Sequence, residues 1–297
     1  MTVYPNVKLN IGLRVLGKRP DGYHELHTAF VPCYAFSDCL EIVPAATFEV
    51  EISGPEYTGW DPSEDLTARA WRLLRADFGI PPVRISLEKR SPVGAGLGGG
   101  SADGAFALVA LGEMFSLGLS KEALADYAAG LGSDCAFFVY NFPMFGSGRG
   151  EVLEPLRLPL DGYRFEVAVP EGVHVSTREA YEGLKLATVE DIPDLREVLA
   201  ATPIERWKDV VVNDFEASVF KKYPVIAELK EEFFRKGAVY AAMSGSGSAV
   251  FGIFRDKAAR EDARLDPRQH SNASRWQRCC FLLPRRCRPK PQRFAAG

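Results

Sequence analysis

The chain has 297 residues, long enough to bury a large apolar core and to form two domains of ordinary size. Hydrophobic residues make up 46% and charged residues 25% of it, which excludes a disordered or fibrous protein. No apolar run reaches the roughly 18 residues of a membrane span, and the first residues lack the order of a secretory signal. We therefore expect a soluble, cytoplasmic, globular protein with no membrane association.

The charge of the chain is unevenly distributed. Residues 1–256 carry 25 Lys and Arg against 36 Asp and Glu, a net charge of −11, whereas residues 257–297 carry 11 against 3, a net charge of +8. A basic end can bind nucleic acid, but a solvated or aberrant end is the simpler interpretation, so we expect no nucleic-acid partner. The six cysteines form no Cys-x-x-Cys pair, and we expect reduced thiols with neither disulfide nor zinc.

The first predicted element is a strand near the start of the chain. Apolar residues alternate with polar ones from Val7 to Val15, which is the period of a half-buried strand. Lys8 and Asn10 should therefore share one face. Asp21-Gly22 predicts a turn. Further strand-like runs follow at residues 40–43, 48–52 and 83–87.

Helices alternate with these strands. Leu66 to Leu74 have helical spacing after capping residues at 61–64, and a second helix should begin near Ser101. Ser120 should cap a third, which ends at a glycine, Gly130 or Gly132. The pattern restarts after a boundary between residues 151 and 161. A strand is expected at 165–169, helices at 177–184, 193–199 and 225–236, and an apolar run at 249–254, but no clear element from residue 271 onward.

The strongest chemical signal is a glycine-rich segment between the strand at 83–87 and the second helix. It comprises Pro92, Val93, Gly94, Ala95, Gly96, Leu97, Gly98, Gly99, Gly100, Ser101 and Ala102. Glycines permit close approach of the backbone, and a helix start offers free N–H groups at the positive end of its dipole. The segment therefore predicts a phosphate site, with a merely flexible turn as the alternative.

Two familiar phosphate sites do not fit this segment. Gly94, Gly96 and Gly99 match G-x-G-x-x-G, but the acidic residue about 20 positions later, Glu113, lies inside the predicted helix rather than at a strand end. A Walker A loop needs a lysine where Gly100 stands. We expect a nucleotide site of another kind.

Two weaker signals become informative only in combination. Residues 244–248 form a glycine-serine turn, which we place between a helix and the apolar run; such turns are usually tight connections and sometimes phosphate contacts. Asp134 precedes the apolar segment 135–140, where a carboxylate is ordinarily a turn or cap residue but can also serve as a general base.

Three segments together resemble the ordered motifs of the GHMP kinases: residues 5–10, the glycine-rich segment and residues 244–248. The stretches 17–24, 132–134 and 213–216 resemble the members whose substrate carries a cytidine diphosphate group. The resemblance covers about residues 3–256. It implies an α+β fold of two domains, an N-terminal ribosomal-S5-like domain at 1–157 and a C-terminal ferredoxin-like α/β sandwich at 158–297, with the active site between them.

The resemblance also implies an activity. ATP, with Mg²⁺ expected beside it, should phosphorylate the 2-hydroxyl of a cytidylyl-methylerythritol in the synthesis of isoprenoid precursors, and the enzyme should be a monomer or homodimer without an obligate protein partner. Asp134 matches the catalytic base and Lys8 the lysine beside it, while residues 92–102 match the ATP loop. The substrate-binding positions are matched by Asn10, Tyr23, His24 and Tyr181.

Some positions depart from the family pattern. Asp65 stands where asparagine is usual near the adenine, and Ala102 and Gly104 replace the commoner serine and alanine. No carboxylate cage for a metal is evident, so no metal ligand is assigned, although the Ser101 hydroxyl is a candidate contact of the nucleotide's Mg²⁺. Residues after about 266 look unlike the family, and we hypothesise a frame-shifted or otherwise aberrant end.

Three rival functions remain. The first is another GHMP kinase of the mevalonate or homoserine type. The second is a nucleic-acid-binding protein that uses the basic end, whose binding would weaken steeply with salt. The third is a kinase-like fold that only binds ligands, which the presence of both Lys8 and Asp134 disfavours because binding alone has no need for that pair.

Overall fold

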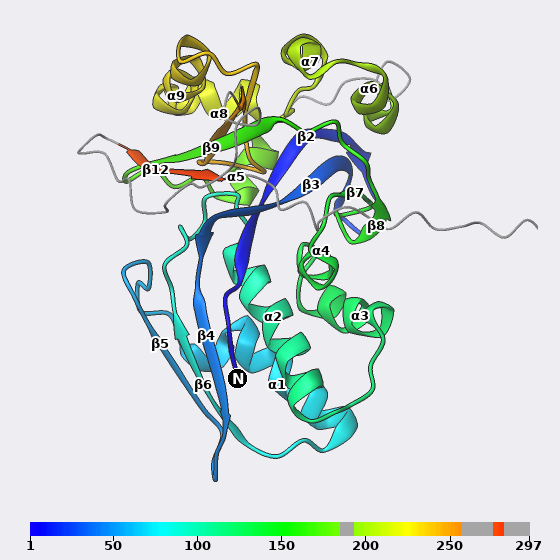
Figure 1. Cartoon of the computed structure of the whole chain (residues 1–297), viewed down its shortest axis with the longest axis vertical. Helices are drawn as coiled ribbons and strands as arrows, with labels where there is room; N and C mark the ends of the chain where they lie inside the picture. The colour runs from blue at the N-terminus through cyan, green and yellow to red at the C-terminus, as the bar shows by residue number, and fades with distance from the viewer. Residues whose placement is uncertain (185–192, 257–275, 282–297) are drawn as a thin grey trace, which may run out of the picture.

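We describe a computed structural model of the chain, which covers residues 1–184 and 193–256 together with the backbone of residues 276–281. The strands of these residues form three four-stranded sheets. Two of the sheets and four helices are built from the first half of the chain, and the third sheet from the second half (Figure 1). None of the helices in the described ranges combines the length and the apolar character needed to cross a membrane.

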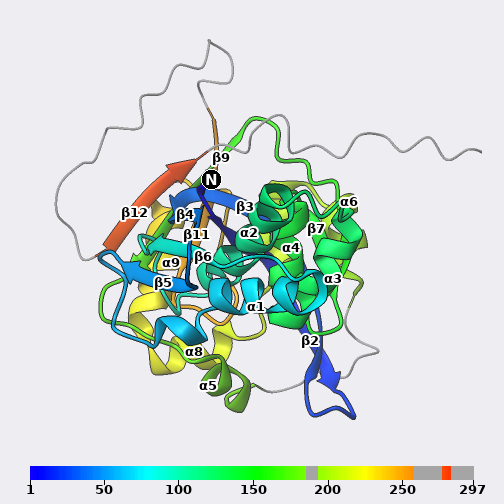
Figure 2. The same ribbon diagram turned by 90° about the horizontal axis from the view of Figure 1, so that it is seen from below.

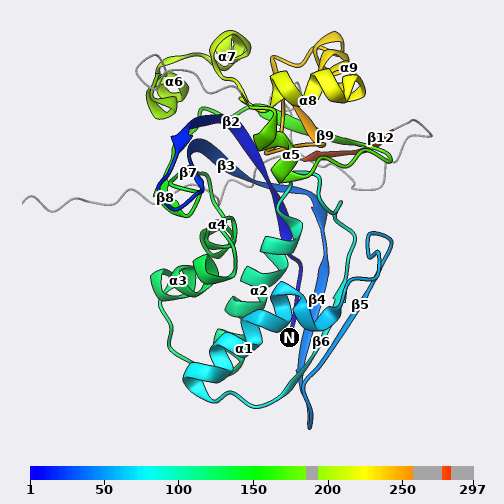
Figure 3. The same ribbon diagram turned by 180° about the vertical axis from the view of Figure 1, so that it is seen from behind.

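The first sheet forms one end of the molecule. Its strands, in spatial order, are β1 (Thr2–Val3), β4 (Cys39–Pro44), β6 (Val83–Glu88) and β5 (Glu49–Ser53). All neighbours are antiparallel except β5 and β6. The apolar side chains of alternate positions, such as Leu40 and Ile85, pack with α1 (Leu66–Phe78) and α2 (Gly99–Met114) in one core. Figure 3 shows both helices along one side of β4, β5 and β6.

The second sheet carries the site. Its strand order is β2 (Asn6–Lys18), β3 (His24–Ser37), β7 (Met144–Ser147) and β8 (Val152–Pro155). The helices α3 (Lys121–Leu131) and α4 (Cys135–Tyr140) precede β7 in the chain. β2 and β3 form a long antiparallel hairpin whose tip extends beyond the neighbouring helices (Figure 2).

The third sheet is antiparallel, and its strands are β10 (Tyr240–Met243), β11 (Val250–Arg255), β9 (Tyr163–Pro170) and β12 (Trp276–Phe281). Counted along the chain, this is the order 2-3-1-4, which is that of a ferredoxin-like sandwich. Between β9 and β10 the chain forms α5 (Thr177–Glu182), α6 (Leu195–Ala201), α7 (Ile204–Val210), α8 (Glu216–Lys222) and α9 (Pro224–Arg235).

The two halves of the chain share a core. Val7, Leu9 and Ile11 of β2 are buried in the same cluster as Phe165 and Phe251 of the third sheet. Farther along β2, the N–H of Leu13 donates to Val212 O at 2.9 Å. β2 therefore runs through the junction, and its side chains are placed by both halves of the chain.

Most predicted elements are confirmed. The strands at 40–43, 48–52, 83–87 and 165–169 and the helices beginning at 66, near 101 and after Ser120 all exist. The helices predicted at 177–184, 193–199 and 225–236 correspond to α5, α6 and α9. The third helix ends at Leu131 with Gly132 as its cap.

Four expectations need correction. The strand from Val7 is buried on both faces rather than half-buried, because the third sheet covers one face and the glycine-rich segment lies over the other. The cap of α1 is Asp65, whereas Asp61 caps a separate 3-10 turn, η1 (Pro62–Glu64). The segment before the 244–248 turn is the strand β10, not a helix. A strand, β12, lies beyond residue 271, where no element was predicted. The rest of the hypothesised aberrant end, residues 267–275 and 282–297, lies outside the described residues.

Candidate active site

Lys8 is the centre of the site. Its position in β2 buries the side chain, of which 3% is exposed. The ammonium nitrogen donates to Asn10 Oδ1 at 2.5 Å and to Gly96 O at 3.1 Å, and lies 3.2 Å from Asp134 Oδ2. A buried ammonium group is stable only when polar protein atoms replace the water molecules that would hydrate it. Asn10, Gly96 and Asp134 are therefore each held at a fixed distance from Lys8. The prediction that Lys8 and Asn10 share a face is confirmed.

Asp134 approaches Lys8 from the start of α4. It occupies the N-cap position, but its side chain makes no capping hydrogen bond, and 30% of the side chain is exposed. The carboxylate is therefore free of the capping role that its position suggested and faces Lys8 instead. A half-exposed carboxylate beside a buried ammonium can accept a proton from an incoming hydroxyl group.

The glycine-rich segment forms a turn that leads directly into α2. Gly98 is the N-cap with φ +71°, and a Cβ there would lie 3.1 Å from Lys8 Cε. Gly96 has φ +77°, and a Cβ there would lie 2.1 Å from Ser244 O, closer than any side chain permits. No side chain caps the helix, so its first N–H groups are available to an anion. The segment therefore has the uncapped helix start and the positive φ angles on which the predicted phosphate site depends, and phosphate binding itself stays a prediction.

The turn at 244–248 packs against the glycine-rich segment. Ser244 Oγ donates to Gly96 O at 3.0 Å and accepts the Asn10 N–H at 3.2 Å. In turn, Asn213 donates through Nδ2 to Met243 O and Gly245 O, at 2.9 and 2.8 Å. These contacts favour the tight-connection interpretation of the turn, because its serine binds the loop backbone and thereby links the loop to β2.

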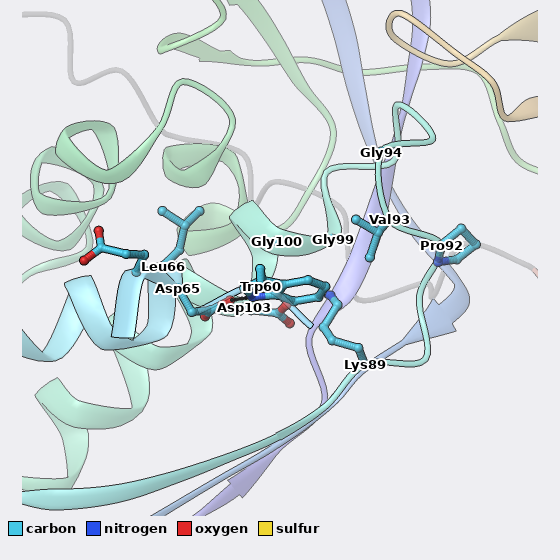
Figure 4. A pocket seen from close by; sticks show the side chains of 11 residues that line it. Trp60, Asp65, Leu66, Lys89, Pro92, Val93, Gly94, Gly99, Gly100 and Asp103 are labelled. Atoms are coloured by element: carbon cyan, nitrogen blue, oxygen red, sulfur yellow. Dashed lines mark hydrogen bonds and ion pairs between the residues drawn. The ribbon is translucent and has the colours of Figure 1, made fainter. Parts of the chain in front are cut away.

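A cavity of about 270 Å³ opens beside the glycine-rich segment, on the side away from the 244–248 turn (Figure 4). It lies between the start of α1 and the start of α2. The Trp60 indole donates to Asp65 Oδ2 at 3.2 Å, while the other oxygen of Asp65 accepts from the Thr67 N–H and hydroxyl. The lining residues are Trp60, Glu64, Asp65, Leu66, Lys89, Pro92, Val93, Gly94, Gly99, Gly100 and Asp103.

A buried polar cluster fixes both ends of the glycine-rich segment. Lys89, just before the segment, donates to Asp38 at 2.5 Å and to Asp103 of α2 at 2.7 Å. Asp38 also accepts the N–H groups of Arg90 and Ser91, at 2.6 and 2.7 Å, and the Ser91 hydroxyl. We call Asp38, Lys89, Ser91 and Asp103 the loop-base cluster. It joins the end of β6 to the first turn of α2 across the base of the loop.

The loop-base cluster holds two carboxyl groups against one ammonium. Burial raises the pKa of Asp103 well above its usual range, against the attraction of Lys89, and the charge of Asp38 adds to the rise. Burial would lower the pKa of Lys89, but Asp103 and Asp38 outweigh it, so that pKa is raised. Asp38 has four donors, whereas Asp103 Oδ1 is buried without a hydrogen-bond partner in the described part of the chain. Of the two carboxyl groups, Asp103 is thus the one that the cluster solvates less well.

Of the predicted substrate residues, Asn10 lies beside Lys8, whereas Tyr23 and His24 lie at the tip of the β2–β3 hairpin and Tyr181 of α5 packs against His24. Tyr23 is 54% exposed, and the rings of His24 and Tyr181 stack with centroids 4.5 Å apart and 21° between their planes. The Tyr181 ring also contacts Phe215 edge-on. Burial raises the pKa of the Tyr181 phenol, and the charge of Asp134 adds to the rise, so this aromatic group lies within electrostatic reach of the carboxylate.

The structure thus brings together the residues that the sequence analysis selected. Lys8, Asn10, Asp134 and the loop form one centre, and the hairpin aromatics lie at its side. Asp38 and Lys89 were missed, although a lysine directly before a glycine-rich loop is a visible signal. Trp60 was also missed, because it and the loop come to line one cavity only in the folded chain.

The Ser101 hydroxyl is placed toward the start of α4. It hydrogen-bonds the Cys135 thiol, and burial of that thiol raises the pKa of Cys135 to about 12, so the cysteine stays protonated and is no nucleophile. Within residues 1–184 and 193–256, no group of three or more His, Cys, Asp and Glu side chains could hold a metal ion. A metal at this site would therefore depend on phosphate oxygens for most of its ligands.

Comparison with known families gives two matches. Residues 65–142 match the GHMP kinases N terminal domain, and residues 190–271 match the GHMP kinases C terminal domain. Together they cover more than half of the chain. The first includes the whole glycine-rich segment and Asp134, and the second includes the 244–248 turn.

The chain is also similar to curated proteins over most of its length. A 4-diphosphocytidyl-2-C-methyl-D-erythritol kinase of Bacteroides fragilis is 48% identical over 260 residues, covering 86% of this chain and 92% of the relative. One from Cytophaga hutchinsonii is 42% identical over 284 residues, covering 95% of this chain and all of the relative.

Among solved structures, a crystal structure of 4-(cytidine 5'-diphospho)-2C-methyl-D-erythritol kinase is 34% identical, with a TM-score of 0.68 over 85% of this chain and 90% of that one. A homoserine kinase from Cytophaga hutchinsonii, 15% identical, has a TM-score of 0.66 over 86% of each chain. At that identity the likeness shows the fold alone.

The loop-base cluster predicts a large, pH-dependent effect of removing its cation. We expect Lys89→Met to lower the free energy of unfolding by about 3–5 kcal/mol at pH 7, because it leaves buried carboxyl groups without a counter-charge. A carboxyl group whose folded pKa is raised stabilises the fold below its unfolded pKa and loses that contribution as pH rises through the folded pKa. Lys89→Met should therefore lower the free energy of unfolding by less near pH 5 than at pH 7.

Urea unfolding followed by circular dichroism at both pH values measures this effect. Lys221→Met is the matched control, because Lys221 is an exposed lysine of α8, and it should change the free energy of unfolding by less than about 0.5 kcal/mol. Equal losses for the two variants would show that the cluster does not stabilise the loop.

Proposed function

The chain belongs to the GHMP kinases, in the family of the 4-diphosphocytidyl-2-C-methyl-D-erythritol kinases, and we propose that it transfers the γ-phosphate of ATP to the 2-hydroxyl of that alcohol, a step in the synthesis of isoprenoid precursors. One observation carries the proposal. The Lys8–Asp134 pair, with 3.2 Å between its charged atoms, lies between a glycine-rich helix start suited to phosphates and a group of aromatic side chains suited to a base.

In the proposed reaction, the oxygen of the substrate's 2-hydroxyl attacks the γ-phosphorus, and Asp134 accepts the proton of that hydroxyl. The bond from the γ-phosphorus to the bridging oxygen breaks, and ADP leaves with the electron pair. Lys8 faces both Asp134 and the loop, so its charge stabilises the negative oxygens of the transferring group. The protein itself forms no covalent bond in this reaction, so positioning of the reactants accounts for most of the rate enhancement.

The nucleotide is placed by the glycine-rich segment. We assign the adenine to the cavity beside Trp60 and the phosphates to the start of α2, since Gly94, Gly99 and Gly100 line the cavity and lead to that helix start. Both oxygens of Asp65 are already hydrogen-bonded, so its role at the base is to hold Trp60 and cap α1. Mg²⁺ would arrive bound to the phosphates, which it neutralises, with the Ser101 hydroxyl as a nearby contact.

The cytosine is assigned to the hairpin tip. Tyr23 offers an exposed face, while His24 offers a hydrogen-bonding edge and Tyr181 a second face. In the structure His24 covers one face of Tyr181 at 4.5 Å, so the base can stack on that face only if His24 moves aside. The hydroxyl to be phosphorylated would then lie toward Lys8, Asn10 and Asp134.

Several expectations accompany this proposal. The domain division at residues 157 and 158, the cytoplasmic location, the monomeric or homodimeric state and the lack of nucleic-acid partners all remain predictions. The alternative acceptors are those of other GHMP kinases, such as mevalonate and homoserine. They lack the cytidine diphosphate group that would occupy the hairpin aromatics.

Substrate selection tests the proposed function. We expect ADP release from ATP and Mg²⁺ with 4-diphosphocytidyl-2-C-methyl-D-erythritol, and none above background with mevalonate, homoserine or galactose, because only the first compound can use both the aromatic group and the Lys8–Asp134 pair. A coupled assay for ADP measures all four. Turnover with mevalonate or homoserine instead would reassign the enzyme within the family.

Replacement of the proposed base tests the mechanism. Asp134→Ala should reduce kcat by about 10²–10⁴-fold, the usual contribution of a general base, with ATP binding retained because the loop is untouched. Asp126→Ala is the control, since Asp126 is an exposed carboxylate of α3, and it should keep wild-type turnover. Near-normal turnover of Asp134→Ala would remove Asp134 from the role of base.

A further inference from the structure

Arg149 lies in the short turn between β7 and β8, in a position that the reaction described so far leaves without a role. Its guanidinium carbon is 4.7 Å from the ring centroid of Tyr23. Its neighbour Gly150 borders the catalytic centre, since a Cβ on that glycine would lie 3.6 Å from Asp134 Oδ1. Arg149 therefore lies between the proposed cytosine site and the proposed base.

The turn that carries Arg149 is tied to the hairpin. The N–H of Gly148 donates to Glu25 Oε1 at 2.8 Å, and the N–H of Leu26 donates to Gly148 O at the same distance. Glu151 accepts the Arg149 N–H at 2.6 Å. Two hydrogen bonds thus hold this turn against the start of β3, and the third fixes Arg149 within the turn. The guanidinium group is therefore positioned by the same strand that carries His24.

The guanidinium group keeps donors for a ligand. Its Nε donates to Glu151 Oε1 at 3.3 Å, and in the described residues no hydrogen bond engages the two terminal nitrogens. One third of the Arg149 side chain is exposed. Arg19, another arginine of the hairpin tip, is by contrast held by both Asp21 and Glu25.

We propose that Arg149 binds the diphosphate of the substrate and thereby selects alcohols linked to a nucleoside diphosphate; this inference rests on the function proposed above. The diphosphate joins the cytidine to the methylerythritol, so it must cross the interval between Tyr23 and Asp134. As a diester it carries two negative charges there. A guanidinium group with free terminal N–H groups matches such oxygens in charge and in its forked geometry.

Steady-state kinetics and direct binding test this role together. For Arg149→Gln we expect the KM for 4-diphosphocytidyl-2-C-methyl-D-erythritol to rise about 10- to 100-fold, the loss of one charged hydrogen-bonded contact, while the KM for ATP changes by less than about two-fold. The value of kcat should fall far less than the KM rises. Arg149→Lys should lie between wild type and Arg149→Gln, because lysine keeps the charge but loses the fork.

Calorimetric titration with CDP and with cytidine separates diphosphate binding from a structural role. Wild type should bind CDP more tightly than cytidine, and Arg149→Gln should lose that preference while its affinity for cytidine is unchanged. The control is Arg206→Gln, an exposed arginine paired with Asp209 on α7, which should resemble wild type in every measurement.

The possible outcomes are distinguishable. If wild type phosphorylates the cytidylyl substrate but Arg149→Gln has the same KM and the same preference for CDP, the inference is wrong and the proposed function stands. If Arg149→Gln loses cytidine and CDP affinity equally, Arg149 only supports the hairpin and the inference is again wrong. If wild type neither turns over the substrate nor prefers CDP to cytidine, both the function and the inference are overturned.

Discussion

The site depends on the burial of one ammonium group. Lys8 lies on a strand that both halves of the chain cover, so its charge must be satisfied by protein atoms. Three partners from different parts of the fold supply this: Asn10 of β2, Gly96 of the glycine-rich segment and Asp134 at the start of α4. Because each must reach the same nitrogen, their mutual distances are fixed before any substrate binds, which is the pre-organisation that phosphoryl transfer requires.

The sequence predicted the features that depend on local chemistry. The alternation from Val7 to Val15 placed Lys8 and Asn10 on one face, and their hydrogen bond confirms it. Glycines before an apolar helix predicted close approach of the backbone and free N–H groups at the helix start, and Gly96, the neighbour of Ser244, and the uncapped start of α2 have that geometry. The resemblance to GHMP kinases predicted an α+β fold of two domains, and the matches to the N-terminal and C-terminal family domains confirm it.

The sequence could not predict features that arise from packing. The long strand β3 was missed because its residues 28–33 are buried on both faces, which removes the alternation that marks a strand. The loop-base cluster was missed because Asp38 and Lys89 are 51 positions apart and meet only in the folded chain. Arg149 was not selected from the sequence, because its proximity to Tyr23 and to the Asp134 side of the site exists only in the folded chain.

The position of the new phosphate in the product shows whether the 2-hydroxyl is the group that reacts beside Asp134 and Lys8. The substrate is prepared with ¹³C at C2 of the methylerythritol, and the product formed with ATP is analysed by ¹³C and ³¹P NMR. The account predicts that phosphorus couples to the labelled carbon, which shows an ester at the 2-hydroxyl near Asp134 and Lys8. Consumption of ATP without that coupling, whether through an ester at another carbon or through release of inorganic phosphate, would contradict it.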